Sequence, residues 1–358
     1  MASSPDQGKL AGIFLIDFSS AFDLVDHSIL LTKLKHYRFD KNPILWLQSY
    51  LEDRKQSTYI NGAYSSPRSV TCGIPQGSCL GPLLYVLFTN DLPLVLSGTD
   101  ACMYADDLTV TAIGGSVNDV QQQLQSDVIS LVKWVTLNKL MINKTKTKAM
   151  LICTSRKRRK LQPLKLLIDG VLIEEVAETR LLGVTIQNNL SWTNHLTHLS
   201  KKVQRAAGVI GRIASHLPRK LLKEISHSLV YSQISYCCSV WGNATKTDKN
   251  RLQVSLNKAA RRVLWSGFDL SVQELHSTLG WPMLDEVISA QSFGLFRKII
   301  AFKTPAGIFN KLKRVSQRHQ INTRNSLKNK FIQPKICSEM GRRTFTHRMI
   351  KMWNISIK

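Results

Sequence analysis

Two adjacent aspartates in the segment Tyr104–Asp107 (YADD) are the residues with the clearest capacity for chemistry. Apolar, β-prone stretches lie on both sides, so Asp106 and Asp107 are expected at the tip of a hairpin. Neighbouring carboxylates repel each other unless a cation lies between them, and hard oxygen ligands suit Mg²⁺. The alternative interpretation is an ordinary turn, because Asp side chains bond to their own backbone in turns.

A third carboxylate, Asp17, lies 89 residues before the pair, in the apolar run 12–18. This run predicts a buried strand, where a charge is costly without a partner. One carboxylate from a strand and two from a hairpin are the ligand set needed to hold two Mg²⁺ ions for in-line displacement. Asp23 and Asp26 lie nearby, and we interpret them as helix acids favoured by the helix dipole.

The Gly- and Pro-rich segment Gly73–Gly77 (GIPQG) is a further candidate for ligand contact. The amide of Gln76 can both donate and accept hydrogen bonds at a nucleotide, and Gly77 removes steric bulk where a backbone must come close. Taken alone, such a cluster predicts an ordinary turn equally well.

The elements that must position these residues form an α+β pattern up to about residue 190. Strands are expected at 12–18, 148–154 and 180–186, hairpins at 57–64, 101–113 and around Asp169-Gly170, and helices at 21–34, 44–51, 83–90 and 117–138. Ser19 and Ser20 are the expected N-caps of the helix at 21–34. Beyond Trp192 an unbroken apolar seam over 196–217 predicts a helix, followed by helices after Pro218 and at 248–265.

The charge of the chain is unevenly distributed. The 358 residues include 49 Lys and Arg against 24 Asp and Glu, a net charge of +25. Residues 1–120 carry −4 and the remainder carries +29. An acidic front joined to a basic back predicts carboxylate chemistry beside a surface for a polyanion, and the alternative is a basic tail on an ordinary enzyme.

Composition excludes several classes of protein. A hydrophobic content of 43% excludes wholesale disorder. No apolar run reaches the roughly 18 residues of a membrane span, so no membrane partner is expected. Seven cysteines without a C-x-x-C pair favour a reduced intracellular chain over a disulfide framework.

Five segments together carry a resemblance to a known family. FLIDFSSAFDLVDH, GIPQGSCLGPLLY, YADD, the run 140–148 and RLLGVTIQNNLSW occur in the order found in reverse transcriptases. Over about residues 8–310 the chain resembles the enzymes of non-LTR (LINE-type) retrotransposons, in particular the jockey-like branch. The resemblance implies a right-hand polymerase palm, an antiparallel sheet packed on helices, followed by a mostly helical thumb and a basic C-terminal region. The expected divisions are a palm with partial fingers at 1–190, the thumb at 191–290 and the basic region at 291–358.

The resemblance also implies a catalytic centre. Asp17 matches the first catalytic aspartate of the family, and Asp106 and Asp107 match the catalytic pair. These three would hold two Mg²⁺ ions, with Mn²⁺ as an alternative ion. Lys146, in a pattern of the N-x-x-K-T type that begins at Asn143, matches the residue that protonates the leaving pyrophosphate. Two neighbouring lysines, at positions 144 and 148, compete with Lys146 for this assignment.

Contacts to nucleotide and primer follow from the same resemblance. Phe22 matches the aromatic residue that lies under the incoming sugar and excludes a ribose 2′-OH. Gln76 and Gly77 match the nucleotide and template contacts of the family's PQG segment. Residues 182–184 resemble the primer-grip turn, and the basic face of the helices after Trp192 would hold the phosphates of the hybrid.

The implied function is RNA-directed DNA synthesis, in which a dNTP is joined to a primer 3′-OH. The partners would be an RNA template, a DNA primer, the RNA–DNA hybrid and dNTPs, in the nucleus after a cytoplasmic ribonucleoprotein stage. The oligomeric state is left open. A viral RNA replicase is disfavoured, because YADD and the bulky Phe22 resemble DNA-making enzymes.

Two alternatives remain. The fingers segment that precedes the first aspartate in the family is missing before Asp17, so we expect a 5′-truncated retrotransposon copy or a partial gene model. A catalytically inactive remnant that only binds RNA or hybrid is therefore the main alternative. The other alternative is a protein-interaction role for the last 60 residues. Separately, the basic run Arg156–Lys160 is interpreted either as a nuclear signal or as a solvated basic loop. His195 and His198 are expected to be surface residues at a helix start.

Overall fold

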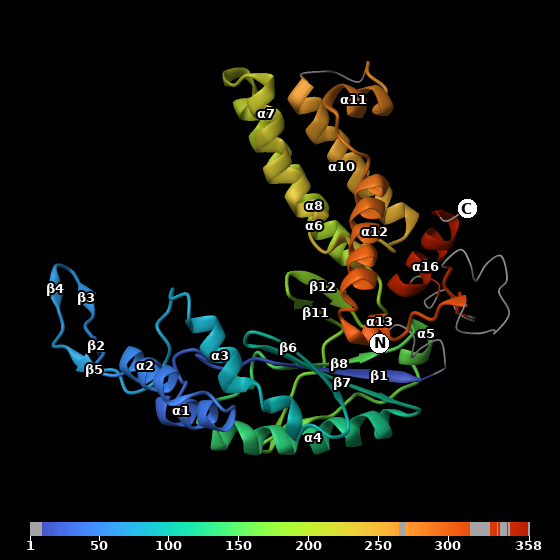
Figure 1. Ribbon diagram of the computed structural model, residues 1–358. Coiled ribbons are helices and arrows are strands. Elements are labelled where there is room, and N and C mark those ends of the chain that lie inside the picture. Colours follow the sequence, from blue (N-terminus) through green and yellow to red (C-terminus); the bar gives the residue numbers. More distant parts are fainter. Residues whose placement is uncertain are drawn as a thin grey trace. The chain divides into compact units, whose positions relative to one another are not determined.

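The computed structural model describes residues 9–264, 269–315, 330–334, 336, 342 and 344–356. The chain divides into two compact units, one that ends at Ala177 and one that begins at Glu178 (Figure 1). Residues 316–329 of the expected basic region at 291–358 lie outside the described residues.

The first unit is built on a four-stranded antiparallel sheet with the strand order β6-β7-β1-β8. The strands are β1 (Leu10–Ile16), β6 (Asp100–Tyr104), β7 (Asp107–Gly114) and β8 (Lys148–Ile152). Strand β1 is central and pairs with β7 on one side and β8 on the other. The strand predicted at 12–18, the hairpin at 101–113 and the strand at 148–154 are thereby confirmed.

Helix α4 (Val117–Leu137) runs along one face of this sheet (Figure 1). Its N-terminus is closed by a capping box, in which Ser116 accepts from the backbone N–H of Asp119 and the Asp119 side chain accepts from that of Ser116. Val120 and Leu124 belong to the helix's buried stripe, which packs against the sheet. The helix predicted at 117–138 is confirmed.

The remaining elements of the first unit surround this sheet and extend from it. The helices are α1 (His27–His36), α2 (Lys41–Leu51), α3 (Gly81–Thr89), α5 (Ser155–Arg158) and the 3₁₀ segment η2 (Leu92–Val95). The paired strands are β2 (Lys55–Gln56) with β5 (Arg68–Ser69), β3 (Tyr59–Ile60) with β4 (Ala63–Tyr64), and β9 (Leu167–Ile168) with β10 (Val171–Leu172). β2 to β5 form an arm that extends away from the sheet (Figure 1). The predicted hairpins around Asn61-Gly62 and Asp169-Gly170 are confirmed.

The helix expected at 21–34 begins later than the sequence predicts. Its N-cap is Asp26, whose side chain accepts from the backbone N–H of Ile29 at 3.0 Å. Ser20 has a φ of 45°, and its carbonyl accepts from the backbone N–H groups of Asp23 and Leu24 in a tight turn. The backbone therefore turns before the helix starts, and neither Ser19 nor Ser20 is its cap.

The second unit begins with a hairpin of β11 (Glu178–Leu181) and β12 (Val184–Gln187). The sequence predicts one strand over 180–186, and that prediction is wrong. Leu182 and Gly183 have φ values of 45° and 80°. Two consecutive residues with positive φ reverse the chain as a hairpin turn. Leucine is uncommon at positive φ, so the residue type at position 182 does not indicate a turn.

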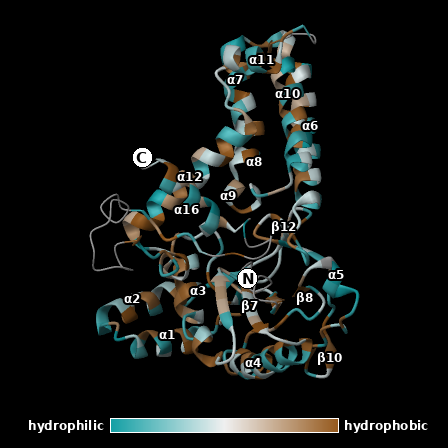
Figure 2. Cartoon of the chain, turned by 90° about the vertical axis from the view of Figure 1, so that its right-hand side faces the viewer, coloured by the Kyte–Doolittle hydropathy of each residue, from teal (hydrophilic) through white to brown (hydrophobic). Residues whose placement is uncertain are grey.

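Helices make up the rest of the second unit. They are α6 (Thr193–Ile213), η3 (Ala214–His216), α7 (Arg219–Ser226), η4 (His227–Tyr231), α8 (Ser232–Ser235), α9 (Cys238–Trp241), α10 (Lys246–Leu264), α11 (Val272–Leu279), α12 (Leu284–Phe302), α13 (Ala306–Phe309) and α16 (Phe345–Ser356). The long helices α6 and α10 pack together around Val203, Ile210, Leu252 and Leu256, and their exposed sides carry polar residues (Figure 2). The helices predicted over 196–217, after Pro218 and at 248–265 are confirmed. Among the described residues, no helix has the length and apolar character to cross a membrane.

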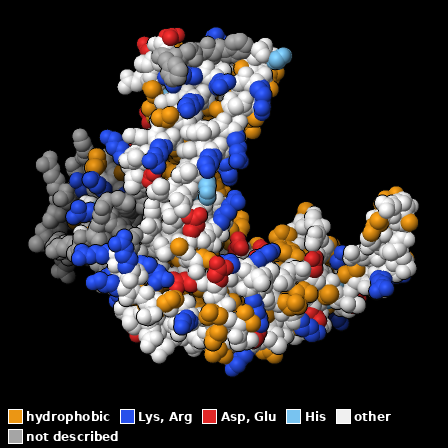
Figure 3. Space-filling model, turned by 180° about the vertical axis from the view of Figure 1, so that it is seen from behind, with side chains coloured by type: hydrophobic (Ala, Val, Ile, Leu, Met, Phe, Trp, Pro, Cys, Tyr) orange, Lys and Arg blue, Asp and Glu red, His pale blue; other side chains and the backbone are white. Residues whose placement is uncertain are grey.

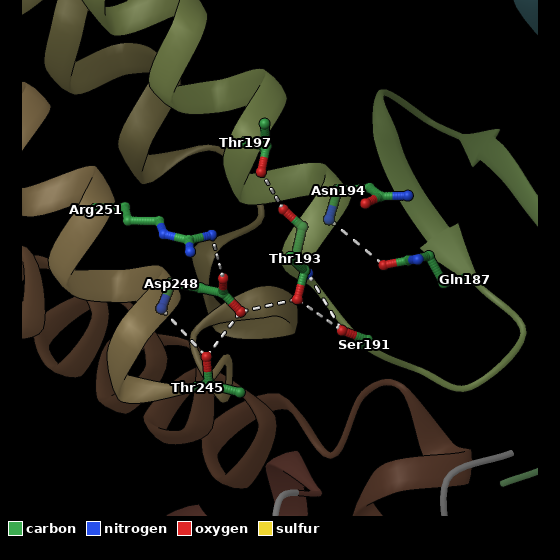
Figure 4. A network of polar contacts seen from close by, with 8 residues as sticks. All are labelled: Gln187, Ser191, Thr193, Asn194, Thr197, Thr245, Asp248 and Arg251. Carbon is green, nitrogen blue, oxygen red and sulfur yellow. Dashed lines mark hydrogen bonds and ion pairs between the residues drawn. The ribbon is translucent and has the colours of Figure 1, made fainter. Parts of the chain in front are cut away.

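A buried aspartate joins the beginnings of α6 and α10 (Figure 4). Asp248 is 5% exposed and accepts hydrogen bonds from the hydroxyls of Thr193 at 2.9 Å and Thr245 at 2.7 Å. Arg251 lies 3.7 Å from its other oxygen. Because each of these contacts offsets the desolvation of the carboxylate, the network fixes the starts of both helices relative to each other.

The close packing of α4 on β1 generates a stability prediction. A Cβ at position 12 would meet Val120 and lie 2.8 Å from the Leu124 side chain. Gly12→Ala is therefore expected to lower the free energy of unfolding by about 1–3 kcal/mol in a urea titration. The control is Gly208→Ala on the exposed side of α6, where a Cβ has nothing within 4 Å. That change is expected to raise the free energy of unfolding by up to about 1 kcal/mol, and equal effects of the two would contradict this packing.

Candidate functional site

The three predicted carboxylates lie at the same end of the central strands β1 and β7. Ile16 lies opposite Leu108 in the antiparallel register, so the next residue, Asp17, lies opposite Asp107 on the same face. Asp106 occupies the turn between β6 and β7, where Ala105 takes a φ of 52°. Asp17 is half-buried, while Asp106 and Asp107 are exposed. The sheet therefore brings these side chains to one edge from positions far apart in the sequence.

The electrostatics of this carboxylate edge are repulsive. Although the Asp107 side chain is exposed overall, partial desolvation of its carboxyl group raises its pKa, and the charges of Asp106 and Asp17 raise it further. Among the described residues, no three His, Cys, Asp or Glu side chains are gathered closely enough to hold a metal ion as they stand. Like charges spread apart, and a divalent cation would draw them together. Three carboxylates are hard oxygen donors, so the chemistry of the donor set fits Mg²⁺ or Mn²⁺.

A tight turn at 143–147 holds the backbone of Asp17. The N–H of Asn143 donates to the carbonyl of Asp17 at 2.8 Å, and the N–H of Asp17 donates to the hydroxyl of Thr147 at 3.3 Å. Asn143 closes the turn, because its side-chain oxygen accepts from the N–H of Lys146 at 3.1 Å. Thr147 is fully buried, and sequence reasoning missed it. Thr147 lies between Lys146 and Lys148, and this polar setting gives no local signal of its burial.

The three lysines that competed for one role differ in their partners. Lys144 pairs with Asp169 at 2.9 Å, and Lys148 pairs with Glu174. No carboxylate pairs with Lys146 within the described part of the chain, and its side chain is exposed. The turn that carries Lys146 is hydrogen-bonded to the backbone of Asp17. Of the three lysines, Lys146 is therefore the one that lies on this turn and has no carboxylate partner among the described residues.

The GIPQG segment is clamped against the loop that follows β1. The N–H of Ile74 donates to the carbonyl of Phe22 at 2.9 Å, and the N–H of Gly73 donates to that of Val25 at 2.8 Å. Gly73 has a φ of 89°, and a Cβ there would lie 2.8 Å from the carbonyl oxygen of Asp23. The glycine is therefore required by both its conformation and this close approach.

Gln76 has a hydrogen-bond partner within the protein, whereas Gly77 has open space beside its Cα. The Gln76 amide donates to the Asp23 carboxylate at 3.0 Å, so it has a protein partner in addition to any ligand. Gly77 has a φ of 77°, with open space where a Cβ would lie. Asp26 is the N-cap of α1, in keeping with its predicted place at a helix N-terminus, whereas the same prediction is wrong for Asp23, which lies in the turn before that helix. Although burial opposes the shift, hydrogen bonds from Lys139, at 2.6 Å, and from the cap residues hold the pKa of Asp26 well below its usual range.

Phe22 has a partner that sequence reasoning missed. Its ring stacks on the ring of Tyr85, with centroids 4.6 Å apart and planes inclined by 16°. Tyr85 belongs to α3 and is fully buried, and burial and then the charge of Asp106 raise the pKa of its hydroxyl. A tyrosine on the buried stripe of an apolar helix directly after GIPQG is the signal in the sequence that points to it.

The second unit contains a groove with a strongly basic lining. β11, β12 and α6 line it with Arg180, Lys201, Lys202 and Arg205 among others, while Glu178 is its one acid within the described residues. Figure 3 shows many Lys and Arg side chains over the visible face of the helices of this unit.

His195 also lines this groove and is buried, which corrects its prediction as a surface residue. The histidine lies between Trp192 and Trp241, and its Nδ1 accepts from the backbone N–H of Thr185 at 3.3 Å. Burial and then nearby positive charges, beginning with His198, lower the pKa of His195 to about 4. His195 is therefore neutral at physiological pH, whereas His198 is exposed as predicted.

The basic run at 156–160 is not simply a solvated loop. Residues 155–158 form the short helix α5, and Arg158 pairs with the partly buried side chain of Glu175 at 2.8 Å. At least one of its charges therefore has a structural role.

Comparison with known proteins gives consistent matches. Residues 3–186 match the family described as reverse transcriptase (RNA-dependent DNA polymerase). The chain is 29% identical over 295 residues to the probable RNA-directed DNA polymerase from transposon BS of Drosophila melanogaster, covering 79% of this chain and 32% of that protein. It is 28% identical over 291 residues to the RNA-directed DNA polymerase from mobile element jockey of the same organism, covering 77% and 30%. The chain thus spans about a third of the length of these relatives.

Among solved structures, the chain is similar to telomerase from Candida tropicalis in complex with the TWJ fragment of telomeric RNA. The sequence identity is 10% and the TM-score is 0.38, with 76% of this chain and 49% of that chain covered. A likeness of this extent carries no argument about fold or function. The predicted resemblance to non-LTR retrotransposon enzymes is confirmed by the family match and by the transposon relatives.

The raised pKa of Asp107 generates a prediction about stability and pH. The folded chain holds this proton more tightly than the unfolded chain, so stability is lost as the pH rises above about 4, the ordinary range of Asp. Asp107→Asn is therefore expected to raise the melting temperature at pH 7 and to flatten its decline between pH 4 and 7. Added Mg²⁺ is expected to raise the melting temperature of the wild type more than that of the variant.

The control for this experiment is Asp119→Asn. Hydrogen bonds from Ser116 lower the pKa of Asp119, so its stabilising contribution is present at neutral pH and is lost as the pH falls. The control is expected to lower the melting temperature at pH 7. A melting temperature that falls equally in both variants would contradict the repulsion assigned to Asp107.

Proposed function

The chain belongs to the reverse transcriptase (RNA-dependent DNA polymerase) family, and we propose that it extends a DNA primer by copying an RNA template. The single observation that carries the proposal is the position of Asp17, Asp106 and Asp107 at the same edge of the sheet, to which the strand pairing brings them from distant parts of the sequence. Family membership implies a dependence on divalent metal ions, and the finer assignment to these three carboxylates is our proposal. In this account the first unit acts as a palm with partial fingers, and the helices after Trp192 act as a thumb.

The three aspartates would hold two Mg²⁺ ions, or Mn²⁺ in their place. When bound, these ions lower the pKa of the primer 3′-OH and neutralise the charge on the leaving pyrophosphate. The contribution of the chain is to keep the carboxylates where the strands place them. Hydrogen bonds from the turn at 143–147 hold the backbone of Asp17. The pairing of β1 with β7 then sets the position of Asp107 relative to Asp17.

Residues around the edge supply binding and proton transfer. Phe22 lies on the loop after β1 and would contact the sugar of the incoming dNTP, where its ring leaves no room for a 2′-OH. Gln76 and Gly77 would contact the nucleotide and template. Lys146 is the lysine that we assign to pyrophosphate protonation, because Lys144 and Lys148 are engaged in ion pairs.

The basic groove of the second unit would bind the phosphates of the primer and hybrid. Its cations come from one face of α6 and from the β11–β12 hairpin, whose turn at 182–184 corresponds to the proposed primer grip. Buried, neutral His195 has its Nδ1 occupied by the Thr185 N–H, which leaves the Nε2 proton as a donor. Binding of this kind is sensitive to salt and tolerant of sequence.

The catalytic proposal is tested by primer extension on an RNA template. Asp106→Ala is expected to reduce dNTP incorporation by at least about 100-fold, because one ligand of the proposed ions is lost. Asp100→Asn is the matched control, since Asp100 is an exposed carboxylate at the start of β6 in the same hairpin. Equal extension by the wild type and Asp106→Ala would contradict the site. Hybrid binding without extension by the wild type would favour the binding-only alternative.

The binding proposal is tested by titrating hybrid against the chain over a series of salt concentrations. Replacement of Lys201, Lys202 and Arg205 by Gln is expected to weaken binding and to reduce the slope of log K against log salt by up to about 0.9 per residue. The control replaces Lys246 and Lys258 on α10, which do not line the groove. A slope that changes equally in the two variants would show that the groove is not the site of phosphate contact.

A further inference from the structure

Tyr85 is a buried residue that the resemblance to known enzymes did not assign to any role. It lies on the inward side of α3 with Leu84 and Phe88, while Leu83 and Val86 on the same helix are exposed. Helix α3 starts four residues after Gly77, with Pro82 in its first turn, so its position follows from the clamped GIPQG segment. The ring of Tyr85 therefore provides a fixed surface against which another side chain can pack.

Phe22 packs on this surface. The two rings lie 4.6 Å apart and are nearly parallel, at 16°, which is a stacked arrangement. The carbonyl of Phe22 accepts from the N–H of Ile74, so the backbone of Phe22 is held by the same segment that precedes α3. Phe22 itself is half-buried. One face of its ring is therefore covered by Tyr85, and contact with a ligand is left to the remaining surface of the ring.

The hydroxyl of Tyr85 is a cost rather than a source of stability. It is buried and has no hydrogen-bond partner. Burial raises its pKa first and the charge of Asp106 raises it further, which shows that the field of the carboxylate edge reaches this group. A buried donor without a partner lowers folding stability, so the useful part of this side chain is its ring.

We propose that Tyr85 is a positioning residue that determines sugar specificity, because its ring fixes the plane in which Phe22 excludes a ribose 2′-OH. This inference rests on the proposed polymerase function and deepens it. The rotation of Phe22 about χ2 is restricted only while a flat, rigid surface lies against it. A leucine at position 85 is smaller and presents no flat face, so Phe22 would tilt and admit a ribonucleotide.

Three variants separate the ring from the hydroxyl and from general packing. Tyr85→Phe keeps the stack and removes the unpartnered hydroxyl, so it is expected to keep wild-type preference for dNTP over rNTP and to raise the melting temperature. Tyr85→Leu is expected to reduce that preference by about 3- to 10-fold, the loss that corresponds to one aromatic stack. Phe88→Leu changes a fully buried residue on the same helix and is expected to lower the melting temperature without changing the preference.

The preference is measured as the ratio of incorporation efficiencies for dNTP and rNTP on the same primer and template. A reduced ratio in Tyr85→Leu, with ratios kept in Tyr85→Phe and Phe88→Leu, supports the inference. An unchanged ratio in Tyr85→Leu overturns it, and so does an equal reduction in Phe88→Leu.

A second measurement does not depend on turnover. The chain labelled with 4-fluorophenylalanine gives a ¹⁹F signal for each Phe, and the signal of Phe22 is identified by its loss in Phe22→Leu. Tyr85→Leu is expected to shift and broaden that signal, whereas Phe88→Leu is expected to leave it unchanged. If the wild type incorporates no nucleotide, the proposed function fails while this spectrum still decides the packing, and an unmoved Phe22 signal in Tyr85→Leu overturns the inference.

Discussion

The register of β1 against β7 is the constraint on which the rest of the first unit depends. It sets Asp17 opposite Asp107, and a slip of one residue would turn one of the two carboxylates to the other face of the sheet. The surrounding elements maintain this register. Helix α4 packs into the space that Gly12 leaves open, β8 pairs along the other side of β1, and the turn at 143–147 bonds the backbone of Asp17.

The same arrangement lowers the folding stability of the first unit. Three like charges lie at one edge, and buried Tyr85 beside them carries a hydroxyl without a partner. Neither feature is explained by folding stability, and the raised pKa of Asp107 shows that the folded chain resists the charge it needs. Local cost of this kind is typical of sites shaped for a ligand, since the surrounding core supplies the stability that the site gives up.

Much of the fold was predictable because its signals are local. The apolar run of β1, the stripe of α4 with its cap at Ser116 and the Asn61-Gly62 turn each follow from residue spacing. The carboxylate triplet followed from adjacent charges beside buried strands. The helix start at His27 was not predictable, because the backbone conformation at Ser20 overrode side-chain preference. The turn at Leu182 was indicated only by the resemblance of residues 182–184 to a primer-grip turn, since leucine is uncommon at a positive φ. Burial of His195 depends on tertiary contacts that no spacing reveals. The spacing that places Tyr85 on the buried side of α3 likewise does not reveal which ring stacks on it.

The account is tested most directly by locating Mn²⁺ in crystals of the chain bound to primer, RNA template and a non-hydrolysable dNTP analogue. Mn²⁺ can replace Mg²⁺ at oxygen ligands, and its anomalous scattering identifies its position independently of the protein atoms. The account predicts anomalous peaks in contact with the carboxylates of Asp17, Asp106 and Asp107, beside the Phe22 ring. Peaks at other carboxylates only, with these three side chains still apart, would contradict it.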